Sequence, residues 1–496
     1  MRCSARCWGI GSQGPKSFDL LQWLFVRIML FVVLFLMTIS KHGSLQADKL
    51  KWDAKAFLNT EELIKYWGYE GETHYVTTED GYILSVHRIA NKTSKFPPVY
   101  LQHGLLTASD LWVVRGPKED LAFMLADLGY DVWMSNARGT TYSKNHTTLS
   151  PKQPKFWEHS YHEMGKYDLP AVIDHVLNET GRPQLFYIGH SMGTLMFYVM
   201  AASRPEYNSK IIVSFSLAPI CFMSHLVAKP FAKMIADSTP AWDSLIGNTG
   251  FLEVFPRNRK MSEAFYKLMK DPERHDILWL ALFNLVGTDW TLLDQAQMPS
   301  VLSHLPSGTS FQTIQALSQQ LYHPDEFRAY DYGPKENLIR YSTEEVPHYN
   351  LSAITCKMSL HYAYNDFLSH PKDVKRLASM LPDVRMVPVK YKQFNHVDFV
   401  WGKNCRKCLE RTLYRLYSFT QPLSLKRGYL ERPRGHLERL RDHRARSRGR
   451  LASRRQKHRA DWTSFFNVLF ILKMCFKLRF LVPYCKYVFR SSDRPM

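Results

Sequence analysis

The chain has 496 residues, of which 45% are hydrophobic and 14% aromatic, so it is long and apolar enough to bury a large core. Its formal net charge of +20 lies mostly at the ends: residues 1–50 carry +4 and residues 421–496 carry +15, which leaves +1 for residues 51–420. A body this close to neutral excludes the broad basic face of a nucleic-acid-binding domain. The eight cysteines are too few and too scattered for a disulfide scaffold.

Cys405 and Cys408 form a C-x-x-C pair, but the sequence has neither a second such pair nor nearby paired histidines to complete a zinc site. A redox pair would be expected in a thioredoxin-like setting, which the surrounding sequence does not have. We therefore expect no metal site and no cofactor, and either free thiols or one structural disulfide.

An apolar segment near the N-terminus predicts export from the cytoplasm. Residues 28–39 form an apolar run that only Thr38 interrupts, and basic residues up to Arg27 precede it. This is the layout of a signal peptide with a long n-region, so we expect residues 1–47 to be a cleaved signal peptide. An uncleaved signal anchor is the alternative, although this run is short for a membrane span of about twenty residues.

Four Asn-x-Ser/Thr sequons in the body of the chain favour the same compartment. Together with an export leader, they predict a glycosylated protein that is secreted or lysosomal. The candidate acceptors are Asn91, Asn145, Asn178 and Asn350.

Strand-like and helical runs alternate along the body of the chain. An Asp80-Gly81 pair between the first two strands predicts a β-hairpin. Strands are expected at residues 74–78, 83–89, 98–102, 130–134, 184–188, 211–217, 357–364 and 384–389. Helices are expected at residues 122–128, 167–179, 194–202 and 371–381. Strands that alternate with helices form a parallel sheet covered on both faces, so we expect an α/β fold with a mostly parallel central sheet.

The alternation stops between residues 221 and 343, which have mainly helical character, including the run at residues 277–283. This stretch is too long for a plain connection between two core elements. We expect a helical cap or lid whose apolar side chains form the walls of an acyl pocket. The alternative is a helical subdomain that only adds stability. The core then consists of residues 48–220 and residues 344–420.

The five residues from Gly189 to Gly193 have the pattern G-x-S-x-G and lie between a predicted strand and a predicted helix, which is the context of a nucleophile elbow. A serine hydroxyl becomes a good nucleophile only when a histidine takes its proton and a carboxylate orients that histidine. In open α/β sheets such groups lie beyond the carboxyl ends of strands. Asp366 follows the penultimate strand and His396 follows the last. We therefore predict that Ser191 is the nucleophile, Asp366 the acid and His396 the base.

Other residues of the same types fit these roles less well. His190 adjoins the serine but should point elsewhere on an elbow. Asp398 is too close in sequence to His396 to approach the ring from behind, and Asp373 falls within a predicted helix. These three are therefore not expected to be catalytic.

The oxyanion of the tetrahedral intermediate requires two backbone N–H donors. The residue directly after the nucleophile, Met192, is expected to supply one of them. The loop after an early strand, His103-Gly104-Leu105, is expected to supply the other through the N–H of Leu105. A simple glycine turn is the alternative interpretation of that loop.

Several longer motifs resemble those of the animal acid lipases, the gastric and lysosomal lipase group of the α/β hydrolases. They occur in the family's order over residues 58–420. The matching stretches are residues 66–69 (YWGY), 78–84 (TEDGYIL), 101–106 (LQHGLL), 130–133 (YDVW), 163–170 (EMGKYDLP), 189–194 (GHSMGT), 308–310 (GTS), 349–350 (YN), 365–366 (ND) and 391–399 (YKQFNHVDF). The resemblance implies an α/β-hydrolase fold with a cap and the same nucleophile, acid, base and oxyanion donors.

The resemblance further implies hydrolysis of neutral lipid esters, such as acylglycerols or sterol esters. We expect a monomer that meets these esters at a lipid–water interface through peripheral contact with lipid aggregates. The alternatives are a carboxylesterase for short soluble esters and a non-catalytic lipid-binding protein of the same fold. The intact serine, aspartate and histidine set argues against the binding protein.

This chain departs from the family pattern in two motifs. Met192 stands where the vertebrate members have glutamine, but its expected contact is through the backbone, so activity should survive. Before Asp366, the sequence 362–365 (YAYN) stands where the family has a glycine pair. This difference affects how the loop positions the Asp366 carboxylate. The cap matches the family least, so substrate choice does not carry over.

Residues 421–496 have no counterpart in the family. An arginine-rich run at residues 426–459 precedes an apolar, basic stretch at residues 465–489. The stretch could lie on a membrane surface, bind nucleic acid, or have no selected fold because it is not part of the native protein. We expect the last, with a tail that is disordered or non-native.

Overall fold

The structure is a computed structural model of the chain, and it describes residues 52–227, 233, 253–271, 279, 283, 285–289 and 291–403. The chain divides into two units, residues 1–420 and residues 421–496. The expected signal peptide, most of the predicted helix at residues 277–283 and the whole second unit lie outside the described residues. None of the described helices combines the length and the apolar character needed to cross a membrane.

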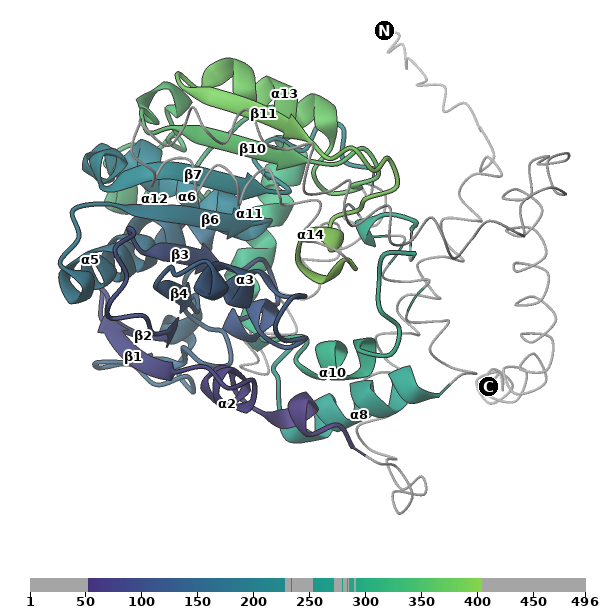
Figure 1. The fold of residues 1–496 in the computed structure, drawn as a ribbon. Coiled ribbons are helices and arrows are strands. Elements are labelled where there is room, and N and C mark those ends of the chain that lie inside the picture. The colour runs from purple at the N-terminus through teal and green to yellow at the C-terminus, as the bar shows by residue number, and fades with distance from the viewer. Residues whose placement is uncertain are drawn as a thin grey trace, which may run out of the picture. The chain divides into compact units, whose positions relative to one another are not determined.

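The described part of the protein contains a nine-stranded sheet, with β1 and β2 at one edge and β11 at the other (Figure 1). The order along the sheet is β1-β2-β4-β3-β6-β7-β10-β11, and β5 pairs with β2. The strands are β1 (Gly71–Thr77), β2 (Tyr82–Ile89), β3 (Val99–Gln102), β4 (Val132–Ser135), β5 (Asn145–His146), β6 (Leu185–His190), β7 (Ile211–Leu217), β10 (Met358–Tyr362) and β11 (Val384–Pro388). The pairs from β4 through β11 are parallel, whereas β1, β2 and β5 pair antiparallel.

The expected alternation of strands and helices is confirmed for the core. Its helices are α2 (Thr60–Tyr66), α3 (Leu121–Asp127), α4 (Tyr161–Glu163), α5 (Leu169–Thr180), α6 (Met192–Ser203), α13 (Pro371–Met380) and α14 (Asp398–Trp401). A π-helical turn, Met164–Asp168, precedes α5, and Gly181 ends α5 in the left-handed conformation with φ 61°. The β-hairpin predicted at Asp80-Gly81 joins β1 to β2.

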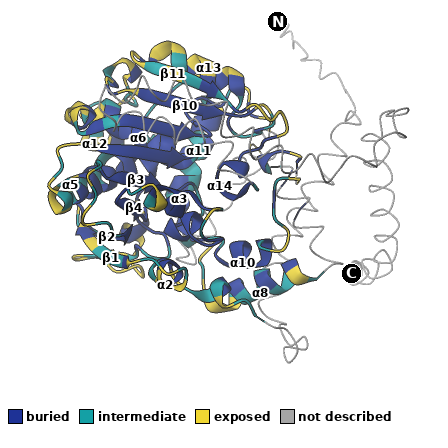
Figure 2. Ribbon diagram, in the orientation of Figure 1, coloured by how far each residue is buried: buried dark blue, intermediate teal, exposed yellow. Residues whose placement is uncertain are grey.

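The sheet is buried on both faces because its side chains alternate between two hydrophobic clusters. Val99 and Leu101 of β3 face one cluster together with α3 and α14, whereas Tyr100 faces the other. This second cluster contains the apolar faces of α5, α6 and α13. Figure 2 shows the strands buried between helices whose outer faces are exposed. Such burial on both sides is what a parallel sheet requires, and it places the polar loops at the strand ends.

The strand before the candidate acid is shorter than the sequence predicts. The expected strand ran to residue 364, but β10 ends at Tyr362. The ladder with β11 ends at the pair Tyr362 and Pro388, where the Val389 N–H donates to the Tyr362 carbonyl at 2.9 Å. Asp366 therefore lies on a turn beyond the sheet, and not at the strand end itself.

The described parts of the inserted region, residues 221–343, contain both helices and a small sheet. They are β8 (Glu253–Val254), α8 (Arg259–Lys270), α10 (Met298–Ser303), β9 (Thr309–Ser310), α11 (Phe311–Tyr322) and α12 (Pro334–Tyr341). The two short strands, β8 and β9, pair antiparallel and were not predicted. Arg257 ties this region to the core because it donates to the buried Asp110 carboxylate at 2.5 Å and to Tyr142 Oη at 2.6 Å.

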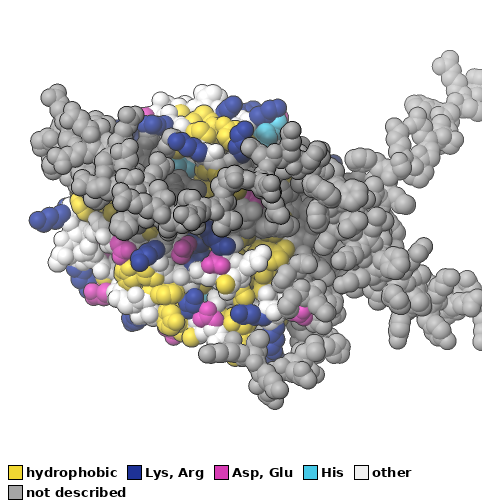
Figure 3. All heavy atoms as spheres, turned by 45° about the vertical axis from the view of Figure 1, so that its right-hand side comes forward, with side chains coloured by type: hydrophobic (Ala, Val, Ile, Leu, Met, Phe, Trp, Pro, Cys, Tyr) yellow, Lys and Arg dark blue, Asp and Glu magenta, His cyan; other side chains and the backbone are white. Residues whose placement is uncertain are grey.

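Charge on the described surface is mixed in sign. On the lower part of the face in Figure 3, Lys and Arg side chains lie among Asp and Glu side chains, whereas Lys and Arg predominate near its upper edge. This agrees with the near-neutral charge of residues 51–420.

Candidate active site

Ser191 occupies a strained turn between a strand and a helix. β6 ends at His190, α6 begins at Met192, and the serine between them has φ 53° and ψ −120°. A positive φ is unfavourable for a residue with a side chain, and it persists only where the surrounding structure holds it. Here the Ser191 N–H donates to the Leu217 carbonyl at the end of β7 at 3.0 Å, which fixes the turn to the sheet.

The turn also requires glycine where α6 passes the neighbouring strand. A Cβ atom on Gly193 would lie 2.6 Å from the carbonyl oxygen of Gln102 and 2.8 Å from that of His103. Real Cβ atoms do not approach a carbonyl oxygen this closely, so only glycine lets the helix pack against the end of β3. The G-x-S-x-G pattern therefore places Ser191 beside the loop that follows β3.

Three side chains from separate loops meet at this turn. His396 Nε2 lies 2.8 Å from Ser191 Oγ, and His396 Nδ1 lies 3.0 Å from each carboxylate oxygen of Asp366. A carboxylate only accepts hydrogen bonds, so Nδ1 carries the proton and donates it to Asp366. Nε2 then has the lone pair that accepts the Ser191 hydroxyl. The structure thus brings together the three residues that the sequence singles out, in the order candidate nucleophile, candidate base and candidate acid.

The Asp366 carboxylate is held by the backbone of its own loop. Its Oδ1 accepts the N–H of Leu368 at 2.9 Å and the N–H of Ser369 at 2.8 Å. Asp366 is 1% exposed and His396 is 4% exposed. A buried carboxylate with these fixed donors keeps the imidazole in one orientation and one tautomer.

The loop after β3 has a peptide group whose direction is fixed. The Gly104 carbonyl accepts from His103 Nδ1 at 2.8 Å and from Thr107 Oγ1 at 2.9 Å. The Ala137 N–H donates to His103 Nε2 at 3.1 Å, which leaves the ring proton on Nδ1. In a trans peptide the N–H points away from the carbonyl, so these bonds also fix the direction of the Leu105 N–H. No acceptor for that N–H is found among the residues that the structure describes.

Met192 is the second candidate donor to an oxyanion. It is the first residue of α6, and the first N–H groups of a helix have no acceptor within the helix. The partial positive charge at a helix N-terminus also favours an anion there. Gly104 and Ser191 lie close together, because a Cβ atom on Gly104 would be 3.1 Å from Ser191 Cβ. Leu105 and Met192 directly follow these two residues, so their N–H groups are the candidate donors to an oxyanion formed at Ser191.

The residues that the sequence argument set aside have other partners in the structure. His190 Nε2 donates to the main-chain carbonyl of His396 at 3.0 Å. Asp373 accepts from His225 Nδ1 at 2.7 Å. Asp398 accepts the Asn395 N–H at 2.8 Å. The bond from His190 was not anticipated, because nothing in a local sequence pattern says which way an imidazole beside an elbow will point.

Asp398 is a buried carboxyl group two residues beyond the candidate base. Burial raises its pKa to about 7, and the Asp289 and Asp366 carboxylates add to the rise. Its Oδ1 has no hydrogen-bond partner among the described residues. The neutral form of Asp398 is therefore favoured in the folded protein over most of the acidic range.

Replacing Asp398 with asparagine is expected to raise the melting temperature at neutral pH and to change it little at pH 4. The folded-state pKa of about 7 lies above the unfolded value of about 3.9, so the parent loses stability as the pH rises through this window. Asparagine does not titrate, and its side-chain oxygen still accepts the Asn395 N–H. Melting curves of both proteins between pH 4 and pH 7.5 test this, and a gap that stayed constant with pH would contradict it.

The described residues offer no metal or redox centre. No group of three or more His, Cys, Asp and Glu side chains among them is arranged to hold a metal ion. Cys221 and Cys356 are buried free thiols in this part of the chain. Burial raises the pKa of Cys356 to about 12 and that of Cys221 well above its usual value, so neither is a reactive thiolate. Cys405 and Cys408 lie outside the described residues.

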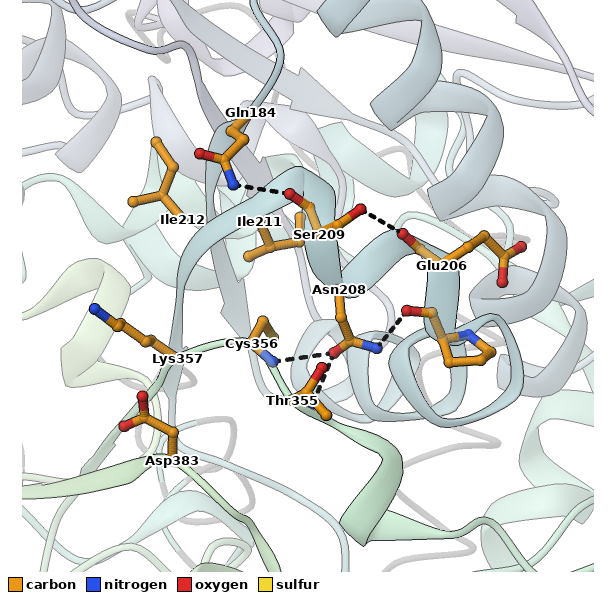
Figure 4. A pocket seen from close by; sticks show the side chains of 11 residues that line it. Gln184, Glu206, Asn208, Ser209, Ile211, Ile212, Thr355, Cys356, Lys357 and Asp383 are labelled. Atoms are coloured by element: carbon orange, nitrogen blue, oxygen red, sulfur yellow. Dashed lines mark hydrogen bonds between the residues drawn. The ribbon is translucent and has the colours of Figure 1, made fainter.

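A surface pocket, whose lining residues are shown in Figure 4, lies at the amino ends of the strands, whereas Ser191 follows the carboxyl end of β6. It is lined by residues at the amino ends of β6, β7 and β10, among them Gln184, Ile211 and Lys357. Ser191, Asp366 and His396 follow the carboxyl ends of strands, and none of them lines this pocket. The pocket is therefore separate from the candidate active site.

A mostly parallel sheet with a serine elbow, followed along the chain by Asp366 and His396, defines an α/β hydrolase. A family model of the α/β-hydrolase fold matches residues 97–242, and one of a partial α/β-hydrolase lipase region matches residues 60–116. The chain is 41% identical over 377 residues to Lipase 1 of Drosophila melanogaster, covering 75% of this chain and 82% of that protein. It is 36% identical to Lipase member N of Homo sapiens (74% and 92% covered) and 36% identical to gastric triacylglycerol lipase of Bos taurus (71% and 89% covered). The chain belongs to the animal acid lipase family, which confirms the resemblance and the fold predicted from the sequence.

Proposed function

We propose that this protein hydrolyses carboxylic esters of neutral lipids, acylglycerols or sterol esters, through an acyl-enzyme at Ser191. The observation that carries this proposal is the hydrogen-bonded series from Ser191 Oγ to His396 at 2.8 Å and from His396 to Asp366 at 3.0 Å. Membership of a family whose relatives are named lipases, one of them a triacylglycerol lipase, supports the substrate class.

The geometry supports the following steps. His396 Nε2 takes the hydroxyl proton while Ser191 Oγ adds to the ester carbonyl carbon, and Asp366 stabilises the imidazolium that forms. The N–H groups of Leu105 and Met192 stabilise the oxyanion of the tetrahedral intermediate. His396 then gives its proton to the alcohol as that alcohol leaves, and the acyl group stays on Ser191. A water molecule that loses its proton to His396 then attacks the acyl carbon. The bond to Ser191 Oγ breaks as His396 returns the proton to that oxygen, which releases the fatty acid and restores the serine.

The inserted region, residues 221–343, is proposed to form a cap that helps to select the ester. Arg257 joins this region to the core through the buried Asp110. The core would then comprise residues 48–220 and 344–420. The second unit, residues 421–496, is given no role in this function.

The decisive experiment compares emulsified long-chain triacylglycerol, an emulsified sterol ester and a soluble butyrate ester at several pH values. A lipase turns over the emulsified esters, whereas a carboxylesterase prefers the soluble one. A fluorophosphonate probe should label the parent at Ser191, because it reacts with an activated serine. A protein that neither turns over any ester nor reacts with the probe would be a lipid-binding protein, and the proposal would be wrong.

We also propose that the protein enters the secretory pathway and is secreted or lysosomal, since it combines an export-type leader, four sequons and relatives that include a gastric lipase. Three sequon side chains are exposed, namely Asn145, Asn178 and Asn350. Asn91 is only partly exposed, and its Nδ2, the atom that would carry a glycan, donates to the Gly129 carbonyl at 3.0 Å.

Glycans are expected at Asn145, Asn178 and Asn350, with lower occupancy at Asn91. The physical reason is that Asn91 Nδ2 faces the protein in the native state, whereas the other three side chains are open to solvent. Glycopeptide mass spectrometry of the protein from a eukaryotic secretion host measures the occupancy of each site. High occupancy at Asn91 with bare asparagines at the other three positions would refute this ranking.

A further inference from the structure

The main chain of His396 is held from two sides by groups that the hydrolytic steps do not use. His190 Nε2 donates to the His396 carbonyl at 3.0 Å, and the His396 N–H donates to the carbonyl of Val286 at 3.1 Å. His190 is the last residue of β6 and directly precedes the nucleophile. Val286 belongs to the inserted region. The backbone of the candidate base is therefore tied to both parts of the protein.

The contact with His190 is made by a neutral, buried imidazole. A carbonyl oxygen only accepts, so the His190 proton is on Nε2, and Nδ1 has no hydrogen-bond partner among the described residues. The ring is 4% exposed, and its centroid is 5.0 Å from that of His396. Burial, and then the nearby His396 ring, lower the pKa of His190 to about 3. No positive charge therefore develops on His190 at mildly acidic pH, where it would oppose the imidazolium of His396.

The segment that contains Val286 is wedged between the loops of the acid and the base. Gly287 has φ 124°, and a Cβ atom there would lie 2.1 Å from the Asn365 carbonyl oxygen and 2.7 Å from Asn395 Cβ. Asn395 Nδ2 also donates to the Asp289 carbonyl at 2.8 Å. Asn365 directly precedes the candidate acid and Asn395 directly precedes the candidate base. The segment at residues 286–289 therefore sets the spacing between these two loops.

We propose that His190 and the segment at residues 286–289 are positioning elements that clamp the main chain of His396. The inference rests on the proposed roles of Ser191, Asp366 and His396. The imidazole is attached to this main chain, so a displaced backbone changes both its 2.8 Å distance to Ser191 and its 3.0 Å distance to Asp366. A misplacement of about 1 Å can cost about 100-fold in rate. Neither element bonds to the reacting atoms, so its loss should lower kcat and leave KM unchanged.

The first test compares His190→Leu with His190→Gln. Leucine fills much of the space but has no donor, whereas the Gln Nε2 amide can reach the position of the His Nε2. We expect kcat to fall about tenfold or more in His190→Leu, by the same factor from pH 4.5 to pH 7, with KM unchanged and kcat largely recovered in His190→Gln. A folded His190→Leu variant with the parent kcat would overturn the role of His190.

The second test compares Gly287→Ala with Gly333→Ala. Both glycines lie outside the backbone regions that L residues adopt, with φ 124° and φ 85°, but a Cβ atom on Gly333 meets nothing within 4 Å, so this control separates backbone strain from the clash at Asn365 and Asn395. We expect a loss of kcat of about tenfold or more in Gly287→Ala only. Equal kcat values in the two variants would overturn the role of the segment. Should Gly287→Ala fail to fold, Asn395→Asp is measured in its place against the same control. Its oxygen still accepts the Val397 and Asp398 N–H groups, and only the donor to the Asp289 carbonyl is lost.

A measurement that does not depend on turnover distinguishes failure of the clamp from failure of the proposed function. In protein labelled with [15N]histidine, the His396 Nδ1 proton donated to Asp366 should resonate far downfield. It should persist in His190→Gln and be broadened or lost in His190→Leu, because the ring is no longer held. If the parent shows neither turnover nor fluorophosphonate labelling, the proposed function fails while this signal still tests the clamp. An unchanged signal in His190→Leu would contradict it.

Discussion

Replacing Ser191 with alanine is expected to lower kcat on every ester substrate by at least about 10⁴-fold while the protein stays folded. Alanine has no hydroxyl to add to the ester carbonyl, so no acyl-enzyme can form. The Leu105 and Met192 N–H groups remain, and they leave only weak residual catalysis through the oxyanion. Serine already occupies the strained turn at φ 53°, and alanine there adds little further backbone strain.

The measurement is release of fatty acid from an emulsified triacylglycerol, followed together with the melting temperature of each variant. Ser203→Ala is the matched control, since Ser203 is the last residue of the same helix and its hydroxyl donates only to the Val199 carbonyl. It should keep the activity of the parent and its fluorophosphonate label. If Ser191→Ala turned over substrate as fast as Ser203→Ala, another residue would have to be the nucleophile.

The core and the candidate triad could be predicted because both follow from regular spacing. Parallel strands such as β6 and β7 are short apolar runs between helical ones, and this pattern survives in the sequence without any tertiary information. Parallel strands also bring their carboxyl ends to one edge, so residues 191, 366 and 396 could be grouped although they are far apart in the chain. The loop at residues 103–105, which follows β3, could be predicted as a candidate oxyanion loop for the same reason.

Other features depend on contacts that no local pattern encodes. Strands β5, β8 and β9 have two residues each, too few for a periodic signal. Arg138 is buried between Asp168, which accepts from its Nε at 2.7 Å, and Asp80, to which both its NH groups donate. This cluster joins the β1–β2 hairpin, the loop after β4 and the turn before α5, and each residue by itself looks like an ordinary surface charge. The structural role of Arg138 depends on its burial and on its ion pairs, and only the three-dimensional structure shows either.

The contacts by which the inserted region could affect function are also not predictable from the sequence. Its helical character can be read from the sequence, but its attachment through Arg257 and Asp110 and the wedge at Gly287 cannot. The contacts of Gly287 place this part of the region against the loops that carry the candidate acid and the candidate base. Substitutions in it should therefore affect the rate of the chemical step as well as the choice of ester.

Asparagine in place of Asp366 is expected to lower kcat by about 10⁴-fold with little change in KM. Oδ1 of the carboxylate accepts the Leu368 and Ser369 N–H groups, so the amide oxygen of asparagine is held at that position. The amide NH₂ then takes the place of Oδ2, 3.0 Å from His396 Nδ1, while the amide oxygen, also 3.0 Å from that nitrogen, has lost the negative charge that held the ring proton there. The imidazole responds by moving its proton to Nε2, which can no longer accept the proton of Ser191.

The Asp366→Asn variant is expected to keep its fold and to lose the reactivity of Ser191. Asp366→Asn should keep its folded structure, because the amide oxygen preserves both backbone hydrogen bonds, and it should lose fluorophosphonate labelling at Ser191. Asp398→Asn is the matched control two residues from the base, and at acidic pH it replaces a carboxyl whose pKa of about 7 already keeps it neutral. It should retain activity within about tenfold at pH 5, since Asp398 accepts from the Asn395 N–H and does not bond to the His396 ring. Equal kcat losses in the two variants would show that Asp366 does not set the tautomer of His396, and the base would then have to be oriented by some other group.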